Sequence, residues 1–147
     1  MAYGCIFVFL LLHTVGSHYT YALVPYDRWM QHLTGRTLSD LFGLERNHYD
    51  RLVHFLYGAL MLVPSADVLR RVAIMRGTGR WLLPVVFLMA QSATYELIEW
   101  GAASVVAPDL GTAYLGTQGD EWDGQKDMAL ATCGAVLATL LFRRLLR

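Results

Sequence analysis

The segment from Trp81 to Val106, WLLPVVFLMAQSATYELIEWGAASVV, most limits what this chain can fold into. Its length exceeds the about 20 residues that a helix needs to cross a bilayer. The segment also holds two carboxylates, Glu96 and Glu99, one helical turn apart. A charged side chain at the centre of a membrane helix costs about 2.5 to 3.5 kcal/mol on insertion scales, and such groups usually face a protein interior. The segment therefore predicts a membrane helix with one polar face.

Three further apolar segments indicate that this helix has partners, and they cover residues 2–16, 52–64 and 128–142. The last two become long enough to span if their helices run from about Asp50 to Arg71 and from about Glu121 to Arg143, with the arginines reaching the interface. The composition is 55% hydrophobic and 16% charged, which is typical of a small polytopic membrane protein. We predict an all-α transmembrane bundle of about four membrane helices, forming a single domain over residues 1–147.

Arginine placement predicts the orientation of this bundle. Basic residues crowd the link between the second and third helices and the end of the chain, namely Arg70, Arg71, Arg76, Arg80, Arg143, Arg144 and Arg147. By the positive-inside rule, both regions and the C-terminus are cytoplasmic in a multi-pass protein, and segments 17–49 and 107–120 lie outside. The first outer segment is rich in Tyr and Trp and contains the amphipathic piece LSDLFGL. We expect it to lie along the membrane interface, in contact with lipid.

Ionisable residues on the predicted helices fall at one depth, near the outer face. Asp50 and His54 are spaced i, i+4 at the start of the second helix, so they share a face. Glu96 and Glu99 lie in the outer third of the third helix. The other residues at this level are Asp120, Asp123 and Asp127 at the start of the last helix and His13 and His18 at the outer end of the first.

Carboxylates outnumber cations in this layer. The nearby cations are Arg51 and Lys126, whereas the acids are Asp50, Glu96, Glu99, Asp120, Glu121, Asp123 and Asp127. An excess of buried carboxylates must bind metal, hold protons or open to water. The formal net charge of zero gives no indication of a nucleic-acid partner.

A metal centre is the leading hypothesis for this layer. The expected ligands are Asp50, His54, Glu96, Glu99, Asp123 and Asp127, with Asp120, His13 and His18 as further candidates. Imidazole together with carboxylates favours Fe, Mn or Zn over Mg or Ca. A metal near the outer leaflet would suit an enzyme that activates water or oxygen against a lipid or other hydrophobic envelope molecule.

Two other classes of function fit the same residues. The carboxylates could relay protons or bind a cation in a small transporter, which with four helices would be expected to act as a homo-oligomer. They could instead fix helix register in a non-catalytic membrane assembly protein, because polar side chains hold membrane helices together. Metal content and cation-dependent uptake distinguish the three classes.

Four blocks of the sequence resemble the YjdF-like family of bacterial inner-membrane proteins, a family named for a domain of unknown function. They are HTVGSHYTYALVPYDRW, LERNHYDRLVHFLYG, YELIEW and LGTQGDEWDGQKDM, and together they cover most of the chain in order. The resemblance implies a polytopic protein of the bacterial inner (cytoplasmic) membrane and gives no activity.

A fainter similarity links the chain to the VanZ-like membrane proteins, which also combine an Asp-x-x-x-His helix start, a later Glu helix and a final helix with Asp followed by small residues. The matching positions are Asp50, His54, Glu96 or Glu99, and Asp127. VanZ-like proteins are linked to glycopeptide resistance and cell-envelope lipids. By association, the similarity implies an envelope substrate.

Overall fold

A computed structural model describes residues 1–72, 75–106 and 117–142, and every regular element in these ranges is a helix. The helices are α1 (Ala2–His18), α2 (Tyr26–Thr34), α3 (Leu38–Phe42), α4 (Tyr49–Val72), α5 (Gly79–Val106) and α7 (Asp123–Phe142). The all-α prediction is confirmed. The predicted outer segment 107–120 falls mostly outside the described residues.

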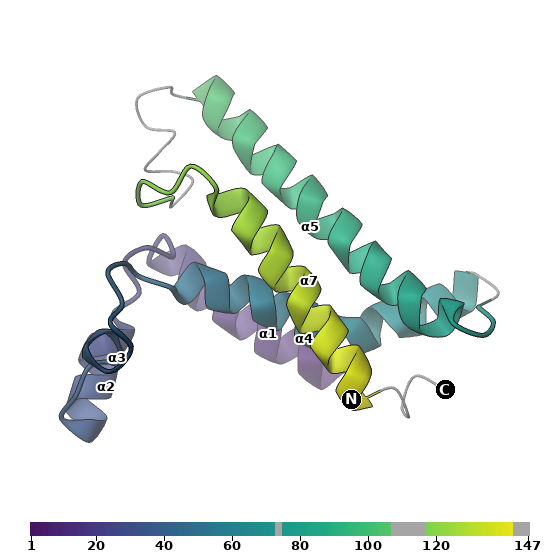
Figure 1. Cartoon of the computed structure of the whole chain (residues 1–147), viewed down its shortest axis with the longest axis horizontal. Helices are drawn as coiled ribbons and strands as arrows, with labels where there is room; N and C mark the ends of the chain where they lie inside the picture. Colours follow the sequence, from purple (N-terminus) through teal and green to yellow (C-terminus); the bar gives the residue numbers. More distant parts are fainter. Residues whose placement is uncertain (73–74, 107–116, 143–147) are drawn as a thin grey trace.

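The four long helices run alternately up and down, with α4 in the middle (Figure 1). α4 packs against α1, α5 and α7, and α5 also packs against α7. This alternation brings the C-terminal ends of α1 and α5 to the same end of the bundle as the first turns of α4 and α7. We call it the acidic end, because the acidic and histidine residues singled out above lie there.

The closest helix contact is the crossing of α4 and α7. A Cβ atom at Gly58 would collide with the Ala131 carbonyl oxygen, and a Cβ atom at Gly134 would collide with the Phe55 carbonyl oxygen. Small residues at such positions let two membrane helices approach until their backbones touch. The crossing therefore fixes the height of α7 against α4, and with it the relative height of the acidic residues on the two helices.

The main apolar core lies away from the acidic end. Its buried members are Leu62, Ala66, Val85, Leu88, Ala135 and Ala138, from α4, α5 and α7. Beyond this core the C-terminal half of α5 diverges from α7 (Figure 1). The bundle is thus closed around its core and open between α5 and its neighbours at the acidic end.

Two of the described helices, α4 and α5, are long and apolar enough to cross a membrane by length and composition. α1 is apolar but has only 17 residues. α7 has 20 residues and begins with the polar sequence DGQKD. The structure therefore agrees with a helical membrane protein, and the number of four spans stays a prediction.

The segment between α1 and α4 forms the short helices α2 and α3 to one side of the bundle (Figure 1). Asp27 on α2 accepts hydrogen bonds from the backbone N–H groups of Leu38 and Ser39 at 2.8 and 3.1 Å, which ties α2 to the start of α3. Large apolar side chains on this pair are exposed, including Leu33 at 81% and Phe42 at 71%.

Candidate metal centre

The first turn of α4 supplies an aspartate and a histidine on one face. Asn47 precedes the helix, and its side-chain oxygen accepts a hydrogen bond from the Tyr49 N–H at 3.0 Å. Asp50 and His54 follow with spacing i, i+4, and Asp50 Oδ1 lies 3.6 Å from His54 Nε2. Both side chains are largely buried, at 15% and 13% exposure.

α5 brings Glu96 to the same histidine. Glu96 Oε1 lies 3.6 Å from His54 Nε2. The carboxylate also lies against the first turn of α7, where a Cβ atom at Gly124 would stand only 2.8 Å from Glu96 Oε2. Glycine at position 124 therefore leaves room for the carboxylate. The N-terminal end of a helix also attracts a negative charge through its macrodipole.

α7 supplies the last member, Asp127, whose residue is only 2% exposed. Asp50, His54 and Asp127 each offer one ligand atom, and these atoms lie within 4.8 Å of one another. We refer to Asp50, His54, Glu96 and Asp127 as the ligand group. The helices α4, α5 and α7 thus place three carboxylates near one imidazole.

The ligand group is not satisfied by its protein surroundings. Within the described residues, Glu96 Oε1 and Asp127 Oδ1 are buried and have no hydrogen-bond partner. A buried carboxylate without a partner is strongly destabilising, so it takes up a proton or binds a cation. The arrangement therefore has the geometry and the unmet charge of a cation site.

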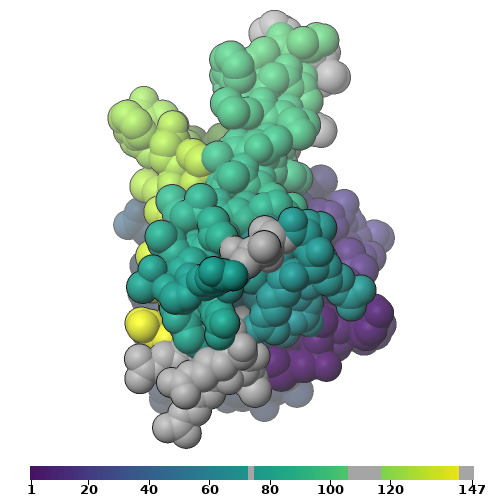
Figure 2. Space-filling model, turned by 90° about the vertical axis from the view of Figure 1, so that its right-hand side faces the viewer, coloured from purple at the N-terminus to yellow at the C-terminus, as the bar shows by residue number. Residues whose placement is uncertain are grey.

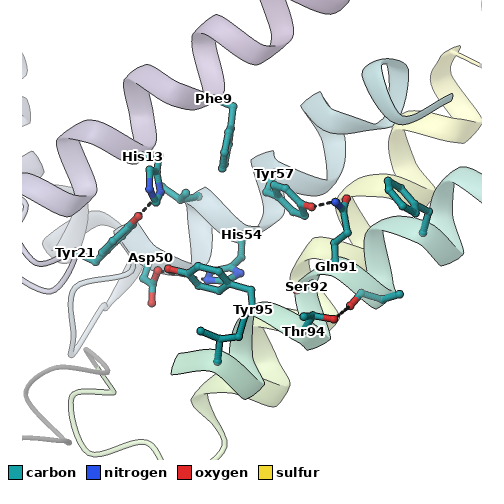
Figure 3. Close-up of a pocket in the computed structure, with 14 residues that line it drawn as sticks. Phe9, His13, Tyr21, Asp50, His54, Tyr57, Gln91, Ser92, Thr94 and Tyr95 are labelled. Carbon is teal, nitrogen blue, oxygen red and sulfur yellow. Dashed lines mark hydrogen bonds and ion pairs between the residues drawn. The ribbon is translucent and has the colours of Figure 1, made fainter. Parts of the chain in front are cut away.

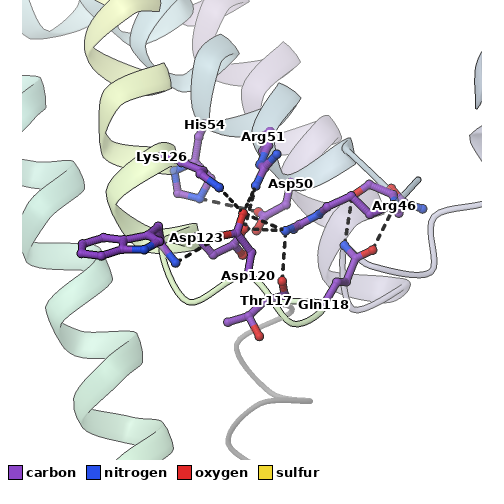
Figure 4. Close-up of polar contacts among 11 residues, drawn as sticks. Arg46, Asp50, Arg51, His54, Thr117, Gln118, Asp120, Asp123 and Lys126 are labelled. Carbon is purple, nitrogen blue, oxygen red and sulfur yellow. Dashed lines mark hydrogen bonds and ion pairs between the residues drawn. The ribbon is translucent and has the colours of Figure 1, made fainter. Parts of the chain in front are cut away.

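A second set of charges lies beside the ligand group and is paired internally (Figure 4). We call it the arginine cluster, and it consists of Arg46, Arg51, Asp120, Asp123 and Lys126. Arg46 Nη1 lies 2.9 Å from Asp123 Oδ1, and Arg51 Nη2 lies 3.3 Å from the same oxygen. Lys126 Nζ lies 2.6 Å from Asp120 Oδ2. Predicted ligands Asp120 and Asp123 are therefore engaged by cations.

Two groups just before the long helices, Asp120 and His48, have pKa values below their ordinary values. The hydrogen bond from Lys126 is the main cause that lowers the pKa of Asp120 to about 2, so this carboxylate stays ionised. Burial, with the charges of Arg51 and Arg46, lowers the pKa of His48 below its ordinary value. His48 is thus held neutral next to the two arginines.

Two reciprocal hydrogen bonds fasten the turn before α7 to the link before α4. The Asn47 N–H donates to Gln118 Oε1 at 3.0 Å, and Gln118 Nε2 donates to the Asn47 carbonyl oxygen at 2.9 Å. Arg46 adds a bond from Nη1 to the Thr117 carbonyl oxygen at 3.0 Å. These contacts hold the first turns of α4 and α7 together, which keeps the ligand group assembled (Figure 4).

A cavity of about 770 Å³ opens next to the ligand group. It lies between the C-terminal half of α5 and the start of α7, where Figure 2 shows a hollow between the two segments. We call it the acidic cavity, because its lining includes Asp50, Glu96, Glu99, Asp120, Glu121, Asp123 and Asp127. Three members of the ligand group, Asp50, Glu96 and Asp127, therefore border this cavity.

The remaining predicted ligands lie outside the ligand group. Glu99 lines the acidic cavity one turn beyond Glu96. His13 Nδ1 is 2.5 Å from the Tyr21 hydroxyl, and His18 is exposed with its ring edge-on to Tyr19 at 4.7 Å between centroids. The two α1 histidines therefore do not join the carboxylates.

Sequence reasoning missed Arg46, which pairs with Asp123 and Asp120. The residue lies in the irregular link before α4, where no helical spacing indicates which way a side chain points. The surplus of acids over Arg51 and Lys126 was interpreted as a metal or proton site, and it is partly balanced by Arg46.

Comparison with known proteins assigns the chain to a family. Residues 1–147 match the family described as "Predicted membrane protein (DUF2238)". The chain belongs to this family. It is 38% identical over 143 residues to the inner membrane protein YjdF of Escherichia coli (strain K12), an alignment that covers 97% of this chain. The resemblance to the YjdF-like family is therefore confirmed.

The chain spans 64% of the length of that Escherichia coli relative. No solved structure matches the chain. The comparisons thus establish a membrane protein related to an inner-membrane protein, and the chemistry has to be argued from the side chains described above.

Proposed function

We propose that the ligand group binds one divalent transition metal, Fe, Mn or Zn, and that the protein is a metal-dependent enzyme acting on a lipid or other hydrophobic envelope molecule. The observation that carries this proposal is the buried Asp127 carboxylate, whose Oδ1 has no partner among the described residues and which lies with Asp50 and His54 in a group spanning 4.8 Å. One imidazole with carboxylate ligands favours these metals over Mg or Ca.

The size of the group supports a shared ion. Ligand atoms about 2.1 Å from one metal lie at most about 4.2 Å apart. Tetrahedral ligands at that distance lie about 3.4 Å apart, so binding would draw together by about 1 Å a group that lies within 4.8 Å. Glu96, with Oε1 at 3.6 Å from His54 Nε2, is placed to complete the coordination as a fourth protein ligand.

A metal bound here would supply Lewis-acid chemistry and a more acidic bound water. The surrounding residues would orient its ligands, since His54 is held between Asp50 and Glu96. The acidic cavity gives water access to the ligand group. Two of the helices that carry the ligand group, α4 and α5, are apolar enough to span a membrane, which supports a hydrophobic substrate.

The orientation of the site follows from charge. Exposed arginines Arg70, Arg71, Arg76 and Arg80 lie at the opposite end of the bundle from the ligand group. By the positive-inside rule that end is cytoplasmic, so the ligand group belongs near the outer face and the C-terminus is inside. A cysteine replacing Glu121 in a Cys5→Ser, Cys133→Ser background should react with an impermeant thiol reagent on spheroplasts. A cysteine replacing Arg76 should not react.

Metal analysis of detergent-purified protein tests the proposal. We expect about one Fe, Mn or Zn per chain in the wild type, and loss of that metal in Asp127→Asn and Glu96→Gln. Glu121→Gln is the matched control, because Glu121 is an exposed carboxylate that lines the same cavity outside the ligand group. It should keep its metal.

Two results would contradict the metal centre. One is a wild-type protein that takes up no metal after supplementation, and the other is an Asp127→Asn variant that keeps full occupancy. If metal is absent and liposomes show cation-dependent uptake that Asp127→Asn abolishes, the carboxylates belong to a transporter. If both readouts are silent, the alternative is a non-catalytic assembly protein.

A further inference from the structure

A second cavity, of about 520 Å³, adjoins the ligand group between α1, α4 and α5. Asp50 lines both this cavity and the acidic cavity, whereas His54 faces the new one and Glu96 and Asp127 face the acidic one. The ligand group therefore forms the boundary between the two cavities. We call the new one the apolar cavity.

Opposite stripes of α5 explain why the two cavities differ. The stripe toward the apolar cavity includes Phe87, Ala90, Thr94 and Ile98, at spacings of three and four residues. The stripe toward the acidic cavity includes Glu96 and Glu99. Residues three and four apart share a helix face, so one helix presents a mostly apolar wall to one cavity and carboxylates to the other.

Figure 3 shows polar groups in two parts of the apolar cavity, one beside the ligand group and one farther along, around Gln91, Ser92 and Thr94. Asp50, His54 and the hydrogen-bonded pair His13 and Tyr21 lie together in the first part. Phe9 lies farther along, with its ring 5.4 Å from that of Tyr57 between centroids. The Tyr57 hydroxyl already donates to Gln91 Oε1 at 3.0 Å. An occupant thus meets a carboxylate and imidazole rings at the metal-binding end, and farther along it meets carbon surface together with the side chains of Gln91, Ser92 and Thr94.

The mouth of the apolar cavity faces sideways. In the described part of the chain α1 and α5 both pack against α4 but do not contact each other, and their side chains form facing walls of the cavity. α5 is apolar enough to span a membrane, and both helices carry exposed apolar side chains, such as Leu10 at 52% and the cavity-lining Ile98 at 64%. With α5 across a membrane, the gap between α1 and α5 would face hydrocarbon.

We propose that the apolar cavity binds one hydrocarbon chain of a membrane lipid, which enters between α1 and α5 with its oxygen-bearing headgroup directed to Asp50 and His54. This inference rests on the proposed function, because it names the substrate class of the same site. The cavity volume of 520 Å³ lies within the range of about 300 to 1,000 Å³ that is usual for small-molecule sites.

A helix from another chain is a poorer fit to this space. A helix with its side chains is about 10 to 12 Å across and needs a groove along several turns. In the core of α4 and α5, Leu62 and Leu88 are fully buried and leave no groove for a further helix. A slender, flexible chain suits a cavity of this volume better than a helix does.

Photo-labelling tests the lipid site. The probe is phosphatidylglycerol with one diazirine-bearing acyl chain, in vesicles of phosphatidylethanolamine and phosphatidylglycerol that contain the full chain. We expect label on α1 and α5 peptides around Phe9, Ala90 and Ile98. Ala90→Phe should lower that label about tenfold, because the added ring takes the space of chain methylenes. Ile98→Trp, on the same wall, should act in the same direction.

Ala129→Phe is the matched control, because Ala129 is an exposed alanine on α7 that lines neither cavity. Its label should equal that of the wild type. Label spread evenly over all exposed helix faces, or unchanged by both cavity-filling variants, would overturn the proposal. Disulfide crosslinks between two Ala90→Cys chains in place of lipid label would also overturn it, by showing that a second copy covers the gap.

Metal content measured on the same samples separates this inference from the function on which it rests. Loss of label in Ala90→Phe with metal retained supports a lipid site beside an intact metal centre. Absence of metal from every sample, with the pattern of label unchanged, would reject the metal centre and leave the lipid site in place.

Discussion

Asp123 and Asp127 lie one turn apart on α7, and they differ in whether a cationic side chain pairs with them. Asp123 is contacted by Arg46 and Arg51 at 2.9 and 3.3 Å. In the described part of the chain no Lys or Arg lies within ion-pairing distance of Asp127, and its Oδ1 is unpaired. The comparison teaches that an excess of acids is a weak sign of a site. A stronger sign is a buried carboxylate that has no Lys or Arg within ion-pairing distance.

The largest expected difference between substitutions of Asp123 and Asp127 is in the stability of the metal-free protein. Asp123→Ala should lower the free energy of unfolding by about 3 kcal/mol, because Arg46 loses its nearest carboxylate and only Asp120 is left to pair with both arginines. Asp127→Asn should leave the metal-free protein as stable as the wild type or make it more stable, since it removes an unpaired charge. Denaturant titration in detergent with a chelator measures both.

The exposed carboxylate Glu121 provides the control for that comparison. Glu121→Ala should change the free energy of unfolding by no more than about 0.5 kcal/mol. If Asp127→Asn proves as destabilising as Asp123→Ala under these conditions, then Asp127 has a structural partner, and the distinction between the two aspartates fails.

Metal removal should give the next largest effect. A ligand that binds only the folded state stabilises it by about 2.7 kcal/mol at a free concentration of about 100 times its Kd. Chelation should therefore lower the melting temperature of the wild type and of Glu121→Gln. Chelation should leave the melting temperature of Asp127→Asn unchanged, because that variant has no metal to lose. An equal shift in Asp127→Asn would place the metal elsewhere on the protein.

Both sets of charges depend on the crossing of α4 and α7, and this dependence is testable. Gly58→Val should destabilise the protein by about 1 to 3 kcal/mol and weaken metal binding, because a side chain there collides with the Ala131 carbonyl oxygen. Gly101→Ala is the control, since no atom lies within 4 Å of the Cβ position at this helical glycine. Metal binding that survives Gly58→Val unchanged would show that the ligand group does not need the close crossing.

The sequence was sufficient to predict the long helices and to name the four residues of the ligand group, together with candidates that lie outside it. Hydrophobic length and the i, i+4 spacing of Asp50 and His54 depend on one helix at a time, so they can be read from the chain. Which carboxylates meet depends on how helices are rotated against one another, and this is set by contacts such as Gly58 with Ala131. The sequence therefore did not separate Asp123, which pairs with arginine, from Asp127, which does not.

The smallest expected effect concerns His48, which borders the arginine cluster. Burial is the main cause that lowers its pKa from 6.5, and the charges of Arg51 and Arg46 act in the same direction, whereas Asp123 opposes them. The folded state thus favours the neutral ring, and the unfolded chain takes up the proton first as the pH falls. The stability that His48 contributes is complete above the unfolded pKa of 6.5 and is lost as the pH falls below it.

Denaturant titration with a chelator at about pH 7.5 and about pH 5.5 should show this loss in the wild type and a smaller loss in His48→Gln. His32→Gln, at an exposed histidine on α2, should behave as the wild type does. The informative quantity is the difference between the wild type and His48→Gln, in which the contributions of all other groups cancel. If that difference is zero, His48 already accommodates its proton beside the arginines. Such a result would mean that the surroundings of His48 are more negative than the aspartates Asp120 and Asp123 alone would make them. The arginine cluster would then differ less in net charge from the ligand group than its ion pairs indicate.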